Sequence, residues 1–320
     1  MNFSRILSSV FLLLVFFTLS GAKPAMVIGG KLYRHGGVVA RELGTGYFTA
    51  NKRFYYARGK EYFSFRAERA DFHFDKVAVA GSFPVRKYGN ALYLSSIDVN
   101  TILRPLFLTA SSVRRHSIRR IIIDPGHGGF DRGAAGKKII EKHYVLSIAR
   151  RTAAILQKCG YQVVLTRNAD YLVPLNQRGA FANARQGDLF VSLHCNSSTD
   201  PRAAGIETYC LTPAGASSTN QKKILNIAYP GNLLDGNNFL LAFEMQKALL
   251  LRTKSADRGV RRGRFAVLRN LKMPGILLEM GFISNPAEEN KLLQAANQEQ
   301  IARGIAVGII NYHRRIYKLK

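Results

Sequence analysis

The sequence has few cysteines and few acidic residues for its length. Its three cysteines, Cys159, Cys195 and Cys210, form an odd set without the spacing of a disulfide framework. A small secreted domain held together by disulfides is therefore excluded. Buried single thiols are the expected state, with one disulfide as the open alternative. With 320 residues and 47% hydrophobic content, the chain is long and apolar enough for two ordinary domains.

The shortage of acid leaves a strong excess of positive charge. Only 20 Asp and Glu residues stand against 47 Lys and Arg, which gives a net charge of +27. Such a field favours binding to polyanions, namely nucleic acid, anionic lipid or acidic wall polymer. The densest basic runs are Arg114–Arg120, Arg261–Arg264 and Arg314–Arg315. For each run taken alone we expect side chains in solvent.

The first 22 residues have the pattern of a secretory signal peptide, cleaved before Lys23. Arg5 precedes an apolar run, Ile6–Leu19, which ends in the small residues Ser20–Ala22. An uncleaved anchor is the alternative, but the run falls short of the roughly 20 residues that span a bilayer. No cysteine follows the run, and no later stretch is long and apolar enough to span a membrane. We therefore expect export to the periplasm or cell envelope, where no nucleic acid partner is expected.

The first half of the mature chain, residues 26–112, is predicted to be a small β-rich module. Short apolar and aromatic runs alternate there with glycine and charge. Gly89-Asn90 predicts a two-residue hairpin turn. His35 and His73 are isolated, so no metal site is expected in this half. Leu94–Leu106 resembles small modules similar to the N-terminal domain of copper amine oxidases, which implies a binding or positioning role.

After a polar, basic linker, Thr109–Ser117, the pattern alternates strand and helix. Apolar spacing from Val145 to Cys159 predicts a helix, and Gly160 supplies its C-terminal stop. Residues 118–320 are therefore predicted to form an α/β domain, with a largely parallel, twisted sheet flanked by helices. The expected strands are Ile121–Ile123, Gln162–Thr166, Leu189–Leu193, Ile206–Leu211 and Ile276–Leu278.

Three polar side chains, His127, His194 and Glu279, come at or just after the ends of apolar strands. Active sites of α/β sheets lie outside the carboxyl ends of the strands, so we expect these side chains to meet. Glycines around His127 permit a tight turn and leave its imidazole uncrowded. The three segments are Asp124–Gly129, Leu189–His194 and Gly275–Glu279.

Helix geometry adds Glu141 to this set. It lies four residues before Val145 and seven before Ile148, so it projects from the buried stripe of the predicted helix. A carboxylate in that position needs a partner. His143 lies about 200° further around the helix and is excluded from the site.

Two imidazoles and a carboxylate, from His127, His194 and Glu141, form a common catalytic zinc shell, with metal contacts of about 2.0 to 2.2 Å. Glu279 is then expected to take the proton from a zinc-activated water. Each residue alone has a simpler interpretation as a loop histidine, a core histidine, a helix-terminal charge or half of an ion pair. Placing four polar side chains at the ends of apolar elements costs free energy unless they have partners, and one shared metal would explain all four.

Several motifs together resemble the zinc-dependent N-acetylmuramoyl-L-alanine amidases in order and spacing, through nearly all of Ile121–Tyr312. They are Asp124–Gly129, Glu141-Lys142, Leu165–Arg167, Asn176–Arg178, Asp188–Asn196 and Leu278–Pro286. The resemblance implies cleavage of the amide between N-acetylmuramic acid and L-alanine in peptidoglycan. It also implies His127, Glu141 and His194 as zinc ligands and Glu279 as the catalytic glutamate. Cys195 departs from the small residue usual in the family, and we expect a packed thiol rather than a ligand.

Two other functions remain open from the sequence. The same zinc shell would serve a carboxypeptidase or peptidase acting on stem peptides. A non-catalytic wall-binding protein could keep the fold, and its positive charge would suit anionic wall or membrane surfaces.

Overall fold

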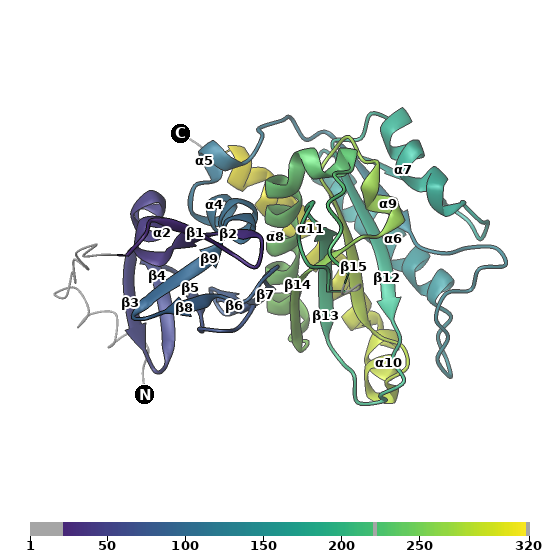
Figure 1. The fold of residues 1–320 in the computed structure, drawn as a ribbon. Coiled ribbons are helices and arrows are strands. Elements are labelled where there is room, and N and C mark those ends of the chain that lie inside the picture. Colours follow the sequence, from purple (N-terminus) through teal and green to yellow (C-terminus); the bar gives the residue numbers. More distant parts are fainter. Residues whose placement is uncertain (1–21, 220–222, 318–320) are drawn as a thin grey trace.

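The computed structural model describes residues 22–219 and 223–317 (Figure 1). The predicted signal peptide, apart from Ala22, lies outside this part of the chain. Within the described ranges, none of the helices combines the length and apolarity needed to cross a membrane.

One large sheet of 11 strands runs through both halves of the chain (Figure 1). Its order is β11 (Gln162–Leu165), β10 (Arg120–Pro125), β12 (Leu189–Asn196), β15 (Gly275–Phe282), β13 (Ile206–Leu211), β14 (Asp257–Gly263), β7 (Val77–Ala80), β6 (Asp71–Phe74), β5 (Glu61–Phe65), β4 (Arg53–Arg58) and β3 (Gly46–Ala50). Neighbours from β11 to β15 are parallel, as are β13 and β14, whereas β13 and β15 run antiparallel. The strands from β7 to β3 are antiparallel. The fold is therefore α/β with a mixed sheet.

A small antiparallel sheet belongs to the N-terminal half alone. It contains β1 (Ala25–Ile28), β2 (Lys31–His35), β9 (Ala91–Ser95) and β8 (Arg86–Tyr88), in that order. Tyr88 pairs with Ala91, so Gly89-Asn90 is the two-residue hairpin turn that the sequence predicted. This half is richer in helix than expected. Besides α2 (Gly36–Leu43), the segment after β9 is helical: α3 (Ser96–Asp98), η2 (Val99–Leu103), α4 (Arg104–Phe107) and α5 (Thr109–Ser112).

The helix α2 was not predicted, because short apolar runs in this half of the sequence resemble strands. Local capping explains why it forms. The His35 side chain accepts a hydrogen bond from the Gly37 backbone N–H at the start of the helix. Gly44 ends it in the left-handed region, at φ 64°. Val39 and Leu43 have no exposed surface, so the helix is stabilised by burial of one face.

Helices cover the two faces of the large sheet unevenly. Three helices, α6 (Glu141–Lys158), α8 (Asp235–Thr253) and α11 (Ala295–Tyr317), pack with one face in the main core. A smaller core on the other face involves α7 (Leu175–Ala184) and α9 (Ala266–Arg269), near η3 (Pro230–Leu234). The short helix α10 (Pro286–Leu293) adds Leu292 to the main core. The predicted helix is confirmed as α6, which ends just before Gly160, a left-handed glycine at φ 86°.

The strand β14 corrects the prediction of a solvated basic run at Arg261–Arg264. Arg262 and Arg264 are only 2% and 3% exposed. Arg262 donates to Thr101 Oγ1 at 2.7 Å and lies over the ring of Phe239. A buried guanidinium needs such partners, and here they come from distant parts of the chain that local composition does not reveal.

The two halves of the chain share this sheet and also a core. Val260 of β14 pairs with Val79 of β7, and the Ala78 N–H donates to Asp257 Oδ2 at 2.7 Å. Gly259, at φ 89°, lies so close to Ala78 that an added Cβ would be 2.8 Å from its carbonyl oxygen. Phe74 of β6 packs edge to face against Phe243 of α8, with ring centroids 5.3 Å apart.

Candidate metal centre and active site

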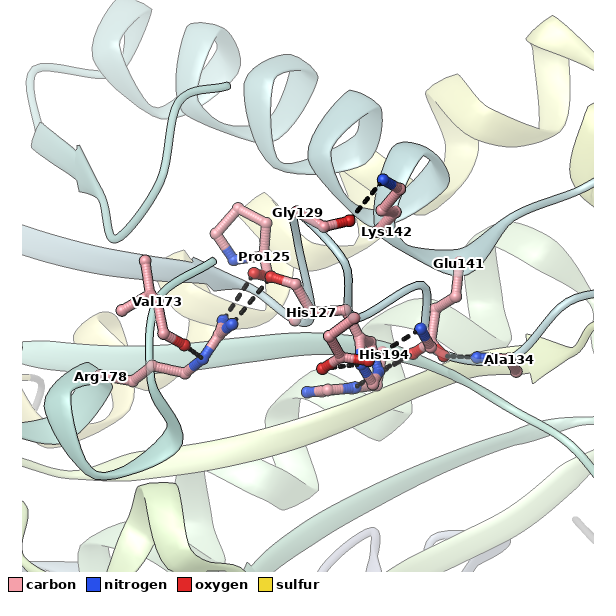
Figure 2. A network of polar contacts seen from close by, with 12 residues as sticks. Pro125, His127, Gly129, Ala134, Glu141, Lys142, Val173, Arg178 and His194 are labelled. Carbon is pink, nitrogen blue, oxygen red and sulfur yellow. Dashed lines mark hydrogen bonds and ion pairs between the residues drawn. The ribbon is translucent and has the colours of Figure 1, made fainter. Parts of the chain in front are cut away.

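A buried polar network supports the loop that follows β10. Asp124 has no exposed surface and accepts hydrogen bonds from Arg178 Nη1 and Ser192 Oγ, at 2.8 and 2.7 Å. Arg178 also donates to the carbonyl oxygens of Pro125 and His127, each at 2.8 Å (Figure 2). Arg167 donates to the carbonyl oxygen of Gly126 at 2.7 Å. Two guanidinium groups therefore fix the backbone that carries His127.

We predict that Arg178→Met lowers the free energy of unfolding by about 3 to 5 kcal/mol, because it leaves the buried Asp124 carboxylate without its cation. Denaturant unfolding of the variant and the wild type measures the difference. Arg202→Met is the matched control, since Arg202 has an 89% exposed side chain and pairs with Asp200 at the surface. A loss below about 1 kcal/mol at Arg178 would contradict the role given to this pair.

The backbone of His127 is in the left-handed region, at φ 61°, which few non-glycine residues adopt. Its Nδ1 lies 2.9 Å from Asp131 Oδ2. That contact orients the ring and leaves Nε2 directed at Glu141 and His194.

Glu141 is the first residue of α6, and both of its carboxylate oxygens are anchored by backbone. Oε2 accepts from the Ala134 N–H at 2.7 Å, and Oε1 accepts from the Cys195 N–H at 2.9 Å. Oε1 also lies 3.1 Å from His127 Nε2 and 3.0 Å from His194 Nδ1 (Figure 2). The geometry expected from the helix period therefore brings this carboxylate to the two imidazoles, while His143 is exposed on the surface of the same helix.

The side chains of His127, Glu141 and His194 have the geometry and chemistry of a metal-binding triad. The two imidazole nitrogens lie 3.2 Å apart, so the three candidate ligand atoms form a triangle with sides of 3.0 to 3.2 Å. Three ligands held at about 2.0 to 2.1 Å around a tetrahedral ion would be separated by about 3.3 to 3.4 Å. The residues therefore fit a metal of this size, and the three side chains are partly or wholly shielded from solvent.

Glycine is required at two places beside the triad. A Cβ at Gly126 would lie 2.2 Å from the His194 ring. A Cβ at Gly133 would lie 2.5 Å from Glu141 Oε2 and 2.6 Å from the His127 ring. The sequence suggested glycines that leave His127 uncrowded, and the structure extends this to all three side chains of the triad.

We predict that Gly126→Ala weakens metal binding by about 10 to 100-fold, because the methyl group displaces the His194 ring. Competition with a chelator of known affinity measures the change. Gly89→Ala is the control, since a Cβ at Gly89 meets no atom within 4 Å although the residue is also a turn glycine at φ 55°. Unchanged metal affinity in Gly126→Ala would contradict the close packing on which the prediction depends.

Glu279 lies next to the triad in the sheet. It pairs with His194 on β12 and with Glu207 on β13. Its Oε2 is buried and has no hydrogen-bond partner among the described residues. Burial, together with the charges of Glu141 and Glu207, raises the pKa of Glu279 well above its ordinary value. Two neighbouring carboxylates, Glu141 and Glu279, of which the second has an unpaired oxygen, favour a cation at the triad.

Sequence reasoning missed Glu207. Its carboxylate is buried and binds Arg258 Nε at 2.5 Å and the Tyr209 hydroxyl at 2.6 Å. The Asn196 amide donates to the same carboxylate at 3.3 Å, so Asn196 has a structural contact here. The alternation of Glu207 and Tyr209 along a predicted strand is the available signal, but nothing near Glu207 in the sequence points to its partner Arg258, 51 residues further on.

The cysteines are all free. Cys195 and Cys210 are buried, as expected for packed thiols, whereas Cys159 is exposed and corrects that expectation. Cys195 contributes its backbone N–H to Glu141, and its thiol is not among the grouped metal-ligating atoms of the described residues.

A family model described as N-acetylmuramoyl-L-alanine amidase matches residues 121–311, more than half of the chain, with all four site residues inside the match. The chain belongs to the N-acetylmuramoyl-L-alanine amidase family. The resemblance drawn from the motifs is therefore confirmed, and this family is metal-dependent.

Curated relatives of this chain include proteins named as the N-acetylmuramoyl-L-alanine amidases AmiC of Neisseria meningitidis and AmiA of Escherichia coli K12. AmiC is 38% identical to this chain, and the match covers 60% of this chain and 52% of AmiC. AmiA is 33% identical, and the match covers 61% of this chain and 76% of AmiA. The chain thus spans about half the length of the Neisseria relative.

Solved amidase structures also match. The amidase from Clostridium difficile 630 is 34% identical, with a TM-score of 0.53 over 62% of this chain and 97% of its own. AmiC2 of Nostoc punctiforme is 34% identical, with a TM-score of 0.52 over 62% and 98%. These matches leave the N-terminal half without a counterpart in those two chains.

Proposed function

We propose that this chain is a zinc-dependent hydrolase that cleaves the amide between N-acetylmuramic acid and L-alanine in peptidoglycan. Family membership supports the reaction, and one observation carries the assignment to this site: the triangle of ligand atoms beside an unpaired, buried glutamate oxygen. Zinc is the favoured metal because two imidazoles and a carboxylate at these separations match its usual catalytic shell.

In this proposal His127, Glu141 and His194 hold the metal. A bound zinc ion supplies Lewis acidity, which makes water a nucleophile near neutral pH and polarises the lactyl carbonyl. Asp131 orients His127 through Nδ1, and the Ala134 and Cys195 N–H groups hold the Glu141 carboxylate in place.

Glu279 is proposed as the general base and acid. Its Oε2 is free to accept a proton from the attacking water and can then donate that proton to the departing L-alanine amine. Glu207 lies beside it with its own charge compensated by Arg258.

The remaining parts of the proposal concern location. We propose residues 1–22 as a signal peptide for export to the periplasm or cell envelope. Residues 118–320 would form the catalytic domain, and residues 26–112 a module that positions it on the wall. The net charge of +27 supports contact with anionic wall or membrane surfaces.

Metal content and cleavage of purified wall fragments, measured on one preparation, test the function. We expect about one zinc per chain and release of intact stem peptides from an uncut glycan. Loss of a terminal D-alanine would identify a carboxypeptidase instead. Binding to wall fragments without turnover, in zinc-loaded protein, would identify a non-catalytic wall-binding protein.

A further inference from the structure

The sheet face that carries the candidate active site continues into the N-terminal half. In the cross-strand register, His194 pairs with Glu279, and Glu279 pairs with Glu207. On the next strands, Tyr209 pairs with Arg261, and Ala80 on β7 pairs with Asp71 on β6. Because side chains alternate between faces, these residues share one face of the sheet. The apolar residues on the other face of the N-terminal strands lie in the main core.

A groove of about 520 Å³ lies on this face where the two halves meet. Its floor includes Ala78 and Ala80 of β7, and its walls include His73, Arg258 and Arg261. Arg258 reaches from this groove to Glu207, which in turn pairs with Glu279. The groove and the active site are therefore joined through a single carboxylate.

The charges of the groove leave a site for an anion. Two acidic lining residues, Glu68 and Asp71, are paired with arginines of their own half of the chain. Arg258 and Arg261, by contrast, share one carboxylate, Glu207, at 2.5 and 3.7 Å. Their side chains are 33% and 29% exposed, so a ligand can reach them. These two arginines therefore carry one positive charge more than the carboxylate that they share, while Asp257, at the same seam, accepts hydrogen bonds from the Ala78 and Gly259 N–H groups.

We propose that this groove is a substrate subsite for the carboxylate-bearing end of the stem peptide. The inference rests on the proposed function, which places L-alanine beside Glu279. The distance from β15 to β7 is three strand spacings, about 14 Å at 4.8 Å each. Four extended residues span about 13 Å. A tetrapeptide that starts at the cleaved bond is therefore long enough to reach across β14 to the β7 side of the groove, where Arg258 and Arg261 line the opposite side.

Charge substitutions on the groove floor test this. Ala80 is partly exposed and lies outside the proposed catalytic machinery. With zinc-loaded protein, Ala80→Glu is expected to lower kcat/KM for an N-acetylmuramoyl tetrapeptide about tenfold, through repulsion of the carboxylate. Cleavage of an N-acetylmuramoyl-L-alanine amide, which ends before the groove, is expected to stay unchanged. Ala80→Lys, of similar size, is expected to stay within about twofold of wild type on both substrates.

The outcomes separate this inference from the proposed function. A wild-type protein that cleaves neither substrate nor wall fragments would remove the function, and the subsite with it. Active variants that treat the two substrates alike would overturn the subsite alone. Equal losses from Ala80→Glu and Ala80→Lys on the tetrapeptide would overturn recognition of a carboxylate.

Peptide binding gives a second measurement that needs no substitution. In calorimetry on the zinc-loaded wild type, the free tetrapeptide is expected to bind about fivefold more tightly than its C-terminal amide. Equal affinities would count against the carboxylate subsite.

Discussion

Glu279→Gln is expected to lower kcat for wall fragments by about 10² to 10⁴-fold while the protein stays folded and zinc-loaded. Glutamine has the same shape as glutamate but cannot take a proton from water at neutral pH. The substitution also removes a charge that repels Glu141 and Glu207, so the free energy of unfolding should not fall. Steady-state kinetics, zinc analysis and denaturant unfolding on one preparation measure all three quantities.

The matched control is Glu299→Gln. Glu299 forms a surface pair with Arg303 on α11 and should tolerate the same chemical change with activity near wild type. If Glu279→Gln retained zinc and more than about a tenth of the wild-type kcat, Glu279 would not be the base. A fall in activity that tracks lost zinc would instead indicate a ligand role.

The elements around the site could be predicted because their signals are local. The apolar runs that lead into His194 and Glu279 predict strands and place both side chains toward the carboxyl ends of those strands, although β12 and β15 each continue for two or three residues further. The 3.6-residue period separates Glu141 from His143 on one helix. The hairpin at Gly89-Asn90 depends on two residues alone.

The parts that sequence reasoning missed depend on partners far along the chain. β14 contains Arg258, Arg261 and Arg262, a composition typical of an exposed loop. It is a strand inside the sheet because Glu207 and Thr101 supply partners for those guanidinium groups. Its pairing with β7, which joins the two halves, has no local signature.

His194→Ala is expected to abolish stoichiometric zinc binding and to lower activity by at least about 10³-fold. It removes one of three ligands, and neutral imidazole contributes strongly to zinc affinity. Zinc is also expected to raise the melting temperature of the wild type, because it binds only the folded site, and this shift should vanish in the variant. His143→Ala is the control, since His143 is exposed on the helix that begins at Glu141.

If His194→Ala retained zinc, another side chain would have to replace the lost ligand. Most of the neighbouring groups already have hydrogen-bond partners or are buried away from the site. Asp131 contacts His127 Nδ1 and accepts from the Gly133 N–H. The Cys195 residue is buried, and its strand neighbour His194 points to the opposite face of the sheet. Glu279 alone has an unpaired oxygen nearby. A second variant therefore combines His194→Ala with Glu279→Gln. If both variants still bound stoichiometric zinc, the metal site would lie elsewhere than at this triad.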